Sequence, residues 1–262
     1  MTSPTSEYWD SVASEWQYPG YDRTWRMVHD AINVELLQQW LQPNSAGSVL
    51  KTDLFDEVVG EGLVPWLSTS FRHVDGIDIS PLLIKLVQPR LPQLRARSAD
   101  VRSLPFPDAT YDVVVSNSTL DHFASAADIP VALAELHRVL RPGGSLVVTM
   151  DNLFNPVVMI RNALPSRLRD MSGAAPFAVG PTCGPGGLRS YLKGAGFEVE
   201  HMRGVFHSPR LLVVLAGDLL DRRASESTKQ RWVRFWRRFE LLGRLPTRYF
   251  TGHFVAALAR KP

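Results

Sequence analysis

Four short apolar runs, rich in β-branched residues and separated by helical segments, constrain the fold of this chain most strongly. They are residues 48–53 (SVLKTD), 73–79 (HVDGIDI), 111–118 (YDVVVSNS) and 145–151 (SLVVTMD), and each has the length and composition of a buried strand. Strands that alternate with helices are typical of a parallel sheet with helices on both faces. Ligands bind such sheets beyond the carboxyl ends of the strands, so the residues that follow each run are the candidate site.

The remaining elements follow from periodicity and from turn residues. Residues 128–140 place four apolar side chains on one helical face, with Asp128 predicted as the N-cap and the Arg-Pro-Gly-Gly sequence 141–144 as the stop. Residues 188–202 predict a helix, a glycine turn and a strand, and residues 252–260 predict the last strand. We divide the chain into an N-terminal helical lid (1–45), a core (46–205) with an irregular Pro- and Gly-rich insertion (152–190), and a C-terminal part with amphipathic helices and the last strand (206–262).

Composition excludes several classes of protein. The chain has 262 residues and one cysteine, Cys183, which excludes an internal disulfide and a zinc site built from cysteines. The N-terminal sequence MTSPTSEYWD has neither the basic nor the apolar region of a secretory signal. No run reaches the roughly 18 consecutive apolar residues that a membrane span needs. We therefore expect a cytoplasmic protein.

The C-terminal part is basic. Residues 221–262 contain 11 Lys and Arg against 3 Asp and Glu, whereas the rest of the chain is acidic. A predicted helix within 229–243 carries aromatic residues on one face and arginines beside it. Its simpler interpretation is packing on the core with solvated arginines, and the alternative is contact with an anionic membrane surface. Nucleic acid is disfavoured as a partner because the positive charge is confined to one helix.

Carboxylates follow two successive strands. Asp78 ends the second strand, where its two oxygens suit the hydroxyls of a ribose. Asp100 follows the third strand, where it can accept the exocyclic amine of an adenine. Helix capping or turn formation is the alternative role for either residue, but their occurrence at successive strand ends favours a ligand site.

Two longer segments carry a family resemblance. Residues 99–123 (ADVRSLPFPDATYDVVVSNSTLDHF) and 132–152 (ALAELHRVLRPGGSLVVTMDN) resemble the core of class I S-adenosylmethionine-dependent methyltransferases, of the small-molecule kind often labelled type 11. The resemblance spans about residues 45–205, and residues 7–16 are similar to the first helix of many members. It implies an α/β fold with a doubly wound, mostly parallel seven-stranded sheet whose last strand is antiparallel.

The resemblance also implies S-adenosylmethionine as cofactor. On it, Asp78 would bind the ribose and Asp100 the adenine, with the backbone of Ile79 and Val101 lining the base. Ser116 and Asn117 would lie under the methionine part and the sulfonium.

The loop after the first strand departs from the family pattern D-x-G-x-G-x-G. Here the sequence is KTDLFDE, with Lys51 at the acidic position and Asp53, Phe55 and Glu57 where glycines are expected. In one interpretation Lys51 meets the methionine carboxylate, Asp53 or Glu57 meets its ammonium, and Thr52 lines the same loop. In the other, the pocket is closed and the fold has another role. The retained strand-end acids favour the first.

His122 is the candidate general base, and Asp121 would orient it or act alone, because imidazole can take a proton at neutral pH. A hydrogen-bonded structural histidine is the alternative. The other histidines considered (73, 137, 201, 207 and 253) show no metal-ligand spacing, so no metal is predicted.

Candidate acceptor contacts come from two segments. The N-terminal aromatic residues would form a lid, and polar residues after the fifth strand would contact the acceptor, although core packing and turn formation explain the same residues. The candidates are Tyr8, Trp9, Trp16, Tyr18, Asn152, Asn155 and Arg161. We predict methyl transfer to a small molecule, which could be hydrophobic or lipid-linked, with oxygen favoured as the atom methylated. The alternatives are a non-catalytic or repurposed domain and, disfavoured because G-x-G-x-x-G is missing after the first strand, a nicotinamide-dependent oxidoreductase.

Overall fold

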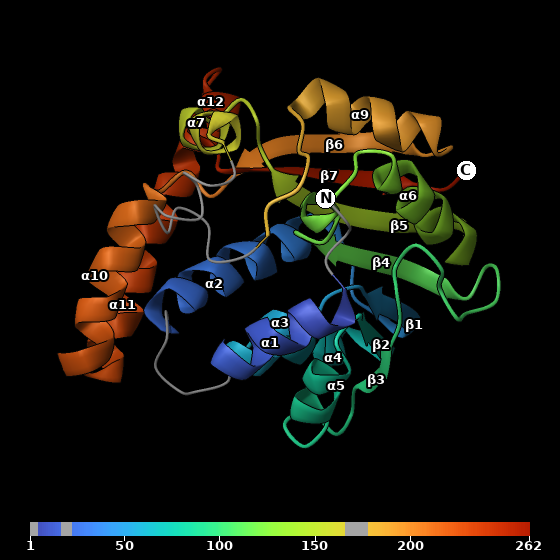
Figure 1. The fold of residues 1–262 in the computed structure, drawn as a ribbon, viewed down its shortest axis with the longest axis horizontal. Coiled ribbons are helices and arrows are strands. Elements are labelled where there is room, and N and C mark those ends of the chain that lie inside the picture. The colour runs from blue at the N-terminus through green and yellow to red at the C-terminus, as the bar shows by residue number, and fades with distance from the viewer. Residues whose placement is uncertain (1–4, 17–22, 166–177) are drawn as a thin grey trace.

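The computed structural model describes residues 5–16, 23–165 and 178–262. A seven-stranded sheet with strand order β3-β2-β1-β4-β5-β7-β6 forms its centre (Figure 1). The strands are β1 (Asn44–Lys51), β2 (Phe71–Asp78), β3 (Arg95–Ser98), β4 (Tyr111–Asn117), β5 (Leu140–Asp151), β6 (Glu198–Val205) and β7 (Phe254–Arg260). Strands β1 to β5 pair in parallel, and β7 runs antiparallel to both β5 and β6. This confirms the predicted fold class.

Helices cover both faces of the sheet (Figure 1). The α-helices are α1 (Ser6–Trp16), α2 (Arg23–Trp40), α3 (Phe55–Val59), α4 (Val64–Ser70), α5 (Pro81–Val87), α6 (Asp128–Val139), α7 (Pro156–Ala163), α9 (Pro185–Gly194), α10 (Arg210–Arg223), α11 (Glu226–Arg237) and α12 (Arg248–Thr251). Two 3₁₀ helices, η1 (Leu120–His122) and η2 (Arg238–Arg244), complete the described elements. Helices α6 and α9 pack on one face of the sheet, and residues of α2 to α5 pack on the other.

The apolar runs form the central strands because their side chains alternate between two cores. Leu50 of β1 pairs with Val114 of β4 in register, and both face the core beneath α6. The preceding residues Val49 and Val113 also pair, and they face the opposite core. A strand buried on both faces is apolar at nearly every position. This explains why the apolar runs predicted these strands.

Two local predictions differ from the structure. Asp128 is the first helical residue of α6 rather than its N-cap, because Ala127 holds that position and the Asp128 carboxylate instead binds Arg102 at 3.1 Å. The insertion 152–190 is not irregular throughout, since it contains α7 and the start of α9. Asn155 caps α7 by accepting hydrogen bonds from the backbone N–H groups of Val157 and Val158. The domain boundaries stay predictions.

The aromatic face of residues 229–243 packs in part against the core. Val233 and Trp236 of α11 are each only 5% exposed and belong to a core cluster with Trp25 and Val28 of α2. Arg237 reaches back to Glu35 of α2 at 2.7 Å. The structure thus agrees with packing on the core for Trp236, while Phe235 on the same helix stays 46% exposed. Within the described residues, no helix combines the length and hydrophobicity needed to cross a bilayer.

Candidate active site

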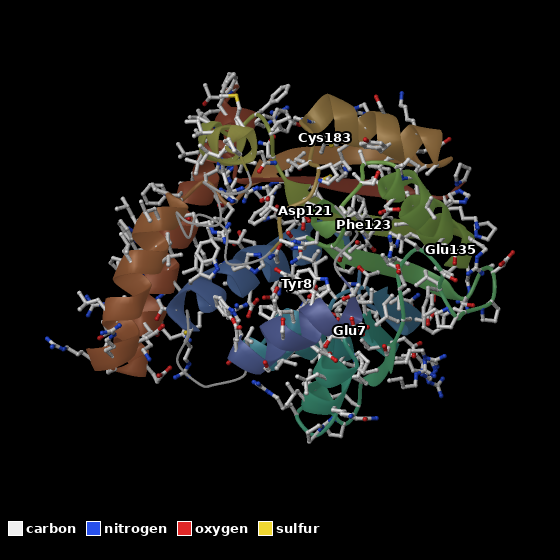
Figure 2. All side chains as sticks on the ribbon, viewed as in Figure 1. Glu7, Tyr8, Asp121, Phe123, Glu135 and Cys183 are labelled. Carbon is white, nitrogen blue, oxygen red and sulfur yellow. The ribbon has the colours of Figure 1, made fainter. Side chains whose placement is uncertain are left out.

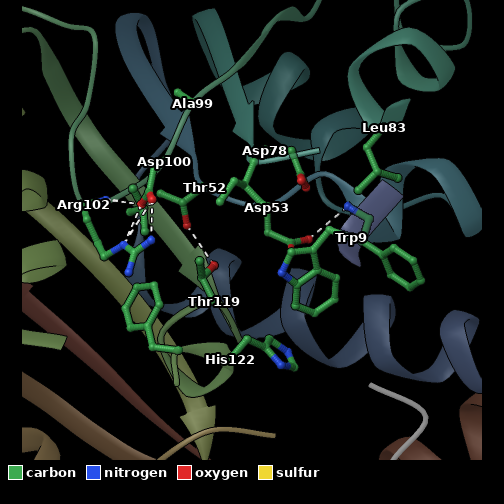
Figure 3. Close-up of a pocket in the computed structure, with 14 residues that line it drawn as sticks. Trp9, Thr52, Asp53, Asp78, Leu83, Ala99, Asp100, Arg102, Thr119 and His122 are labelled. Carbon is green, nitrogen blue, oxygen red and sulfur yellow. Dashed lines mark hydrogen bonds and ion pairs between the residues drawn. The ribbon is translucent and has the colours of Figure 1, made fainter. Parts of the chain in front are cut away.

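Two adjoining cavities open at the carboxyl edge of the sheet. The first, of about 620 Å³ including open solvent, is lined by residues that follow β1, β2 and β3 (Figure 3). The second, of about 920 Å³ on the same measure, is lined by residues of α2 and by residues at or after the ends of β4 and β5. Trp9, Asp53, Phe55 and His122 line both cavities. The two spaces therefore meet at these four side chains.

Asp78 lies at the end of β2 and lines the first cavity. Its carboxylate accepts hydrogen bonds from the backbone N–H of Leu54 at 3.0 Å and of Ser80 at 2.9 Å. Burial raises the pKa of Asp78 to about 6, although these two hydrogen bonds oppose the shift. The backbone contacts leave a second lone pair on each carboxylate oxygen. Asp78 can thus hold the loop and still accept two hydroxyl groups.

Asp100 lines the same cavity and is held by a neighbouring arginine. Arg102 lies 2.6 Å from the Asp100 carboxylate and extends to Asp128 as well. Burial alone would raise the pKa of Asp100, but the hydrogen bonds from Arg102 outweigh it and hold the pKa below its usual value. Ile79 and Val101, the predicted neighbours of the base, also line this cavity. The residues predicted to bind the nucleoside are therefore brought together.

The KTDLFDE loop is organised by a buried ion pair. The Lys51 ammonium lies 2.9 Å from Glu57 and also donates to the carbonyl oxygen of Asp53. The other Glu57 oxygen accepts from the backbone N–H of Leu63 at 2.9 Å. Burial alone would lower the pKa of Lys51, but attraction to Glu57, Asp53 and Asp56 raises it above its usual value. Neither Lys51 nor Glu57 lines a cavity, which differs from their predicted contacts with a methionine group.

Thr52, Asp53 and Phe55 are the residues of this loop that line the first cavity. Burial and the nearby acidic groups raise the pKa of Asp53 above its usual value, despite the opposing Lys51. The Thr52 hydroxyl bonds with those of Ser116 and Thr119, each at 3.0 Å (Figure 3 draws the Thr119 bond). Ser116 is fully buried between strands and lines neither cavity.

Asn117 lines the second cavity rather than the first. Its side-chain oxygen accepts a 2.6 Å hydrogen bond from the Thr149 hydroxyl. The structure therefore places Asn117 in the wall of the second cavity and Ser116 in the sheet, so the predicted pair under the sulfonium is divided.

His122 lies where the two cavities meet, and a loop segment orients its ring. Nδ1 of His122 lies 2.7 Å from the carbonyl oxygen of Ala178. The backbone N–H of Ala178 in turn donates to the hydroxyl of Tyr8, which Figure 2 labels, at 2.7 Å. In a neutral imidazole, a proton on Nδ1 leaves Nε2 as the nitrogen that accepts. The Ala178 carbonyl thus selects the tautomer that a general base at Nε2 requires.

A close backbone approach holds this loop segment in place. Gly180 donates its backbone N–H to the Asp121 carbonyl oxygen at 2.7 Å. A Cβ atom at Gly180 would lie 1.9 Å from the carbonyl oxygen of Phe123. Only glycine allows this approach, and it fixes the loop beside His122.

The Asp121 carboxylate joins the ends of two strands. Its carboxylate accepts from the Ser118 hydroxyl at 3.1 Å and from the backbone N–H of Asp151 at 2.7 Å. Burial, together with the nearby Asp151 charge, raises the pKa of Asp121. Asp121 lines neither cavity. These contacts are structural, and the catalytic role predicted for Asp121 stays a prediction.

The predicted N-terminal aromatic residues differ in which cavity they line. Trp9 lines both cavities and contacts the His122 ring edge-on, with ring centroids 5.2 Å apart, whereas Trp16 lines the second cavity only. Tyr8 contributes through its hydroxyl on Ala178. Tyr18 lies outside the described residues.

Of the three polar residues predicted after β5, only Arg161 reaches a cavity. Arg161 lines the second cavity and is paired with Asp151. Asn152 donates its amide to the carbonyl oxygens of Tyr249 and Gly252, and Asn155 caps α7. Both asparagines are buried and hold backbone, which agrees with turn formation, and their contact with an acceptor stays a prediction.

Several lining residues were not predicted. Those of the first cavity mostly lie within the 99–123 segment, next to the predicted acids, so their position in the chain was a usable signal. Those of the second cavity come from α2, α3, the ends of β4 and β5, the segment at Val179, α10 and β7, and no local pattern connects these segments. They are Leu83, Ala99, Arg102, Thr119 and Phe123 in the first cavity, Phe55 in both, and Trp25, Arg26, His29, Asp56, Ser118, Asp151, Val179, Arg210 and Phe254 in the second.

One cluster has side chains of the metal-ligand type. Within the described parts of the chain, His29, Asp30 and Asp56 bring ligand atoms within 4.8 Å of one another. Arg26 already lies 2.7 Å from Asp56, and the backbone N–H of Gly62 donates to Asp30 at 3.0 Å. Because a guanidinium supplies positive charge to this cluster, we assign no metal to it.

Sequence comparison connects this chain with methyltransferases. The sequence model of a family described as a methyltransferase domain matches residues 59–148. A relative from Mycolicibacterium smegmatis, named "Probable S-adenosylmethionine-dependent methyltransferase", is 31% identical over 180 residues. The match covers 68% of this chain and 62% of that relative. The chain thus spans less than two thirds of the length of this curated relative.

Solved structures share the fold at low sequence identity. The [4+2]-cyclase SpnF superposes with a TM-score of 0.64 at 17% identity, covering 100% of this chain and 98% of that one. Geranyl diphosphate C-methyltransferase from Streptomyces coelicolor, solved with Mg²⁺, geranyl diphosphate and S-adenosyl-L-homocysteine, gives a TM-score of 0.56 at 15% identity. That match covers 88% of this chain and 78% of the other. Both likenesses concern the fold alone.

Proposed function

Because the chain belongs to the class I S-adenosylmethionine-dependent methyltransferase family, we propose that it transfers a methyl group to an acceptor bound in the second cavity. The observation that carries this proposal is the junction of the two cavities. The first cavity holds both strand-end acids, and it meets the second at Trp9, Asp53, Phe55 and His122. A donor and an acceptor placed in the two spaces would face each other there, and such positioning supplies much of the rate of a displacement reaction.

The first cavity fits the nucleoside half of S-adenosylmethionine. Asp78 would accept the two ribose hydroxyls, and Asp100 would accept the adenine amine, with Ile79 and Val101 against the base. When bound, the cofactor supplies a methyl group on a positively charged sulfur. Asp53 is the acid positioned for the ammonium of its amino-acid end, because it lines the cavity while Glu57 is engaged by Lys51.

We propose a small-molecule acceptor with an apolar part, methylated at oxygen. Support for the apolar part comes from the wall of the second cavity, which includes Trp9, Trp16, Trp25 and Phe254. Support for oxygen comes from His122, since a hydroxyl must lose its proton as the methyl group arrives. The Ala178 carbonyl accepts from Nδ1 and thereby directs Nε2 to that task. An aromatic wall of this kind also suits a lipid-linked acceptor.

Calorimetry with S-adenosylhomocysteine tests the proposal. We expect micromolar binding by the native chain and a loss of at least about tenfold for Asp78→Ala, since hydrogen bonds to a charged group contribute about 1.5–3 kcal/mol. Asp108→Ala is the matched control, because Asp108 is an exposed acid outside both cavities. Thermal unfolding of each variant confirms that it is folded.

A second candidate function is a repurposed domain that does not transfer methyl groups. The Lys51–Glu57 pair favours it, because charged side chains replace the expected glycines and bind each other. A protein named as a [4+2]-cyclase shares this fold, so the fold alone does not specify one reaction. The absence of heat at millimolar S-adenosylhomocysteine would select this candidate and reject the first.

A further inference from the structure

The exposed apolar side chains gather at one end of the molecule. Apart from Val131 on α6, every exposed large hydrophobic side chain among the described residues lies between residues 154 and 250. Most of them belong to α7, α10 and α12 or immediately precede α7, and Figure 1 places these three helices at the same end. Concentrated exposed apolar surface marks an interaction site in a soluble domain.

Helix α10 presents a stripe of leucines to solvent. Leu211, Leu215 and Leu219 are one turn apart and are each more than 60% exposed. The opposite side of α10 is anchored, since Val213 is fully buried in the core cluster shared with α2. At 100° per residue, Arg222 and Arg223 at the end of α10 fall on the leucine side, and both are exposed. The stripe therefore ends in two positive charges.

Helices α7 and α12 form a second apolar surface. Val157 and Ile160 of α7 are 66% and 60% exposed. The rings of Phe154 and Phe250 lie 6.4 Å apart between the two helices, and both are exposed. Asn155 fixes this arrangement by donating its amide to the carbonyl oxygens of Phe250 and Thr251. The surface is thus built on held backbone.

These two surfaces flank the second cavity. Arg161 on α7 and Arg210 at the start of α10 both line it. Arg210 is itself held over the ring of Trp25 and against His253. A molecule that enters between α7 and α10 would pass apolar surface on both sides before it reaches the junction with the first cavity.

The positive charge near α10, α11 and α12 indicates what kind of partner this face binds. Residues 221–251, from the end of α10 through α12, carry 9 Lys and Arg against 3 Asp and Glu. Arg231, Arg234 and Arg238 of the α11–η2 segment are exposed, while Val233 and Trp236 point inward. Apolar stripes with a basic border are complementary to an anionic lipid surface. A second copy docking through the same face would bring its own basic border against this one, which disfavours a symmetric dimer.

We propose that the face formed by α7, α10 and α12 docks on an anionic lipid surface and admits an amphiphilic acceptor into the second cavity from that surface. The docking rests on the exposed helices alone, and the entry of an acceptor rests on the proposed function. This face differs from the aromatic side of 229–243, where Trp236 is buried in the core cluster and Trp232 and Phe239 pack partly against it.

Co-sedimentation of the full chain with vesicles tests the docking. We expect binding to vesicles of phosphatidylglycerol and phosphatidylcholine and much weaker binding to phosphatidylcholine alone. The double variant Leu215→Ser/Leu219→Ser should lose at least about tenfold in partitioning, since each leucine gives up apolar burial. Arg222→Gln and Arg223→Gln should each cost about fivefold, the share of one basic residue near an anionic surface. Val131→Ser, which removes an exposed apolar side chain from α6, is the matched control and should bind as the native chain does.

Two results would overturn the proposal. One is sedimentation that the α10 substitutions leave unchanged. The other is a native dimer that the leucine substitutions dissociate, measured by light scattering, because a second copy would then cover the stripe. Calorimetry with S-adenosylhomocysteine on the same preparations separates this proposal from the proposed function, since none of these substitutions touches the first cavity.

Discussion

The two ends of the first cavity are built in different ways. At the nucleoside end, Asp78 and Asp100 stand directly after parallel strands, and the topology alone brings them together. At the other end, the loop 51–57 is shaped by the buried pair of Lys51 and Glu57. The first arrangement follows from strand order, and the second follows from one specific contact between side chains.

This difference predicts which substitutions affect binding and which affect folding. Variants of the strand-end acids leave the backbone pairing of the sheet intact, although Asp78 also holds loop backbone at Leu54 and Ser80. We therefore expect these variants to alter binding more than folding. Lys51 and Glu57 hold β1, α3 and the turn before Leu63 together, so their variants should alter folding first. The predictions below separate the two ends on that basis.

Breaking the buried pair should have the largest effect. Lys51→Met leaves Glu57 buried without its partner, and such a change typically costs about 3–5 kcal/mol. The double variant Lys51→Met/Glu57→Leu removes both charges and should recover most of that loss. Urea unfolding of the three proteins measures the difference. Arg141→Gln, which breaks the more exposed Arg141–Asp112 pair, is the control and should cost less than about 1 kcal/mol.

If the single and double variants are equally stable, the pair does not organise the loop. The claim that this ion pair shapes the loop at the methionine end of the cavity would then be wrong.

Cofactor affinity should depend on pH through Asp78. Burial raises its pKa to about 6, so the carboxylate is ionised above pH 6 and becomes protonated below it. If the ionised form accepts the ribose hydroxyls, affinity for S-adenosylhomocysteine is full at pH 7 and falls below pH 6, by up to about tenfold per pH unit. Asp100 should not contribute, because Arg102 holds its pKa below the usual value.

Calorimetry between pH 5 and 7.5 provides the measurement, and Asp78→Asn, which does not titrate, is the control with a flat profile. A flat profile for the native chain would remove Asp78 from the ribose site.

A smaller loss is expected at Asp100. Asp100→Asn keeps an oxygen that can accept the adenine amine but loses the charge that binds Arg102. We expect a threefold to tenfold weaker affinity for S-adenosylhomocysteine, the range of one ordinary hydrogen bond. Asp128→Asn changes the other partner of Arg102 without lining either cavity, and it should leave affinity within about twofold. Equal losses in the two variants would assign the effect to Arg102 rather than to Asp100.

The smallest effect should appear at the junction of the cavities. Tyr8→Phe removes the hydroxyl that accepts from Ala178 and so loosens the carbonyl that holds Nδ1 of His122. Nitrogen-15 NMR of the imidazole should show the Nδ1–H tautomer in the native chain and a growing share of the other tautomer in the variant. Affinity for S-adenosylhomocysteine should stay unchanged. A native His122 with its proton on Nε2 would remove it from the role of base.

The parts of the site that were predictable are those fixed by strand order. Apolar runs such as 111–118 specify buried strands, and a residue after such a run must lie at the carboxyl edge, which placed Asp78 and Asp100 correctly in one cavity. Lys51 and Glu57 are six residues apart in a loop, and no periodic pattern indicates that they pair. Asn152 and Asn155 follow a strand end, as ligand-binding residues often do. Their amides nevertheless donate to backbone carbonyl oxygens at the end of the distant helix α12. The contact of Ala178 with His122 joins segments 56 residues apart, beyond the reach of local sequence signals.

A crystal structure with S-adenosylhomocysteine tests the central claim most directly. The account predicts the ribose hydroxyls on the Asp78 carboxylate and the adenine beside Asp100, with Lys51 still bound to Glu57 beneath the amino-acid end. A first cavity without nucleoside density at saturating ligand, or a nucleoside that touches neither acid, would contradict it.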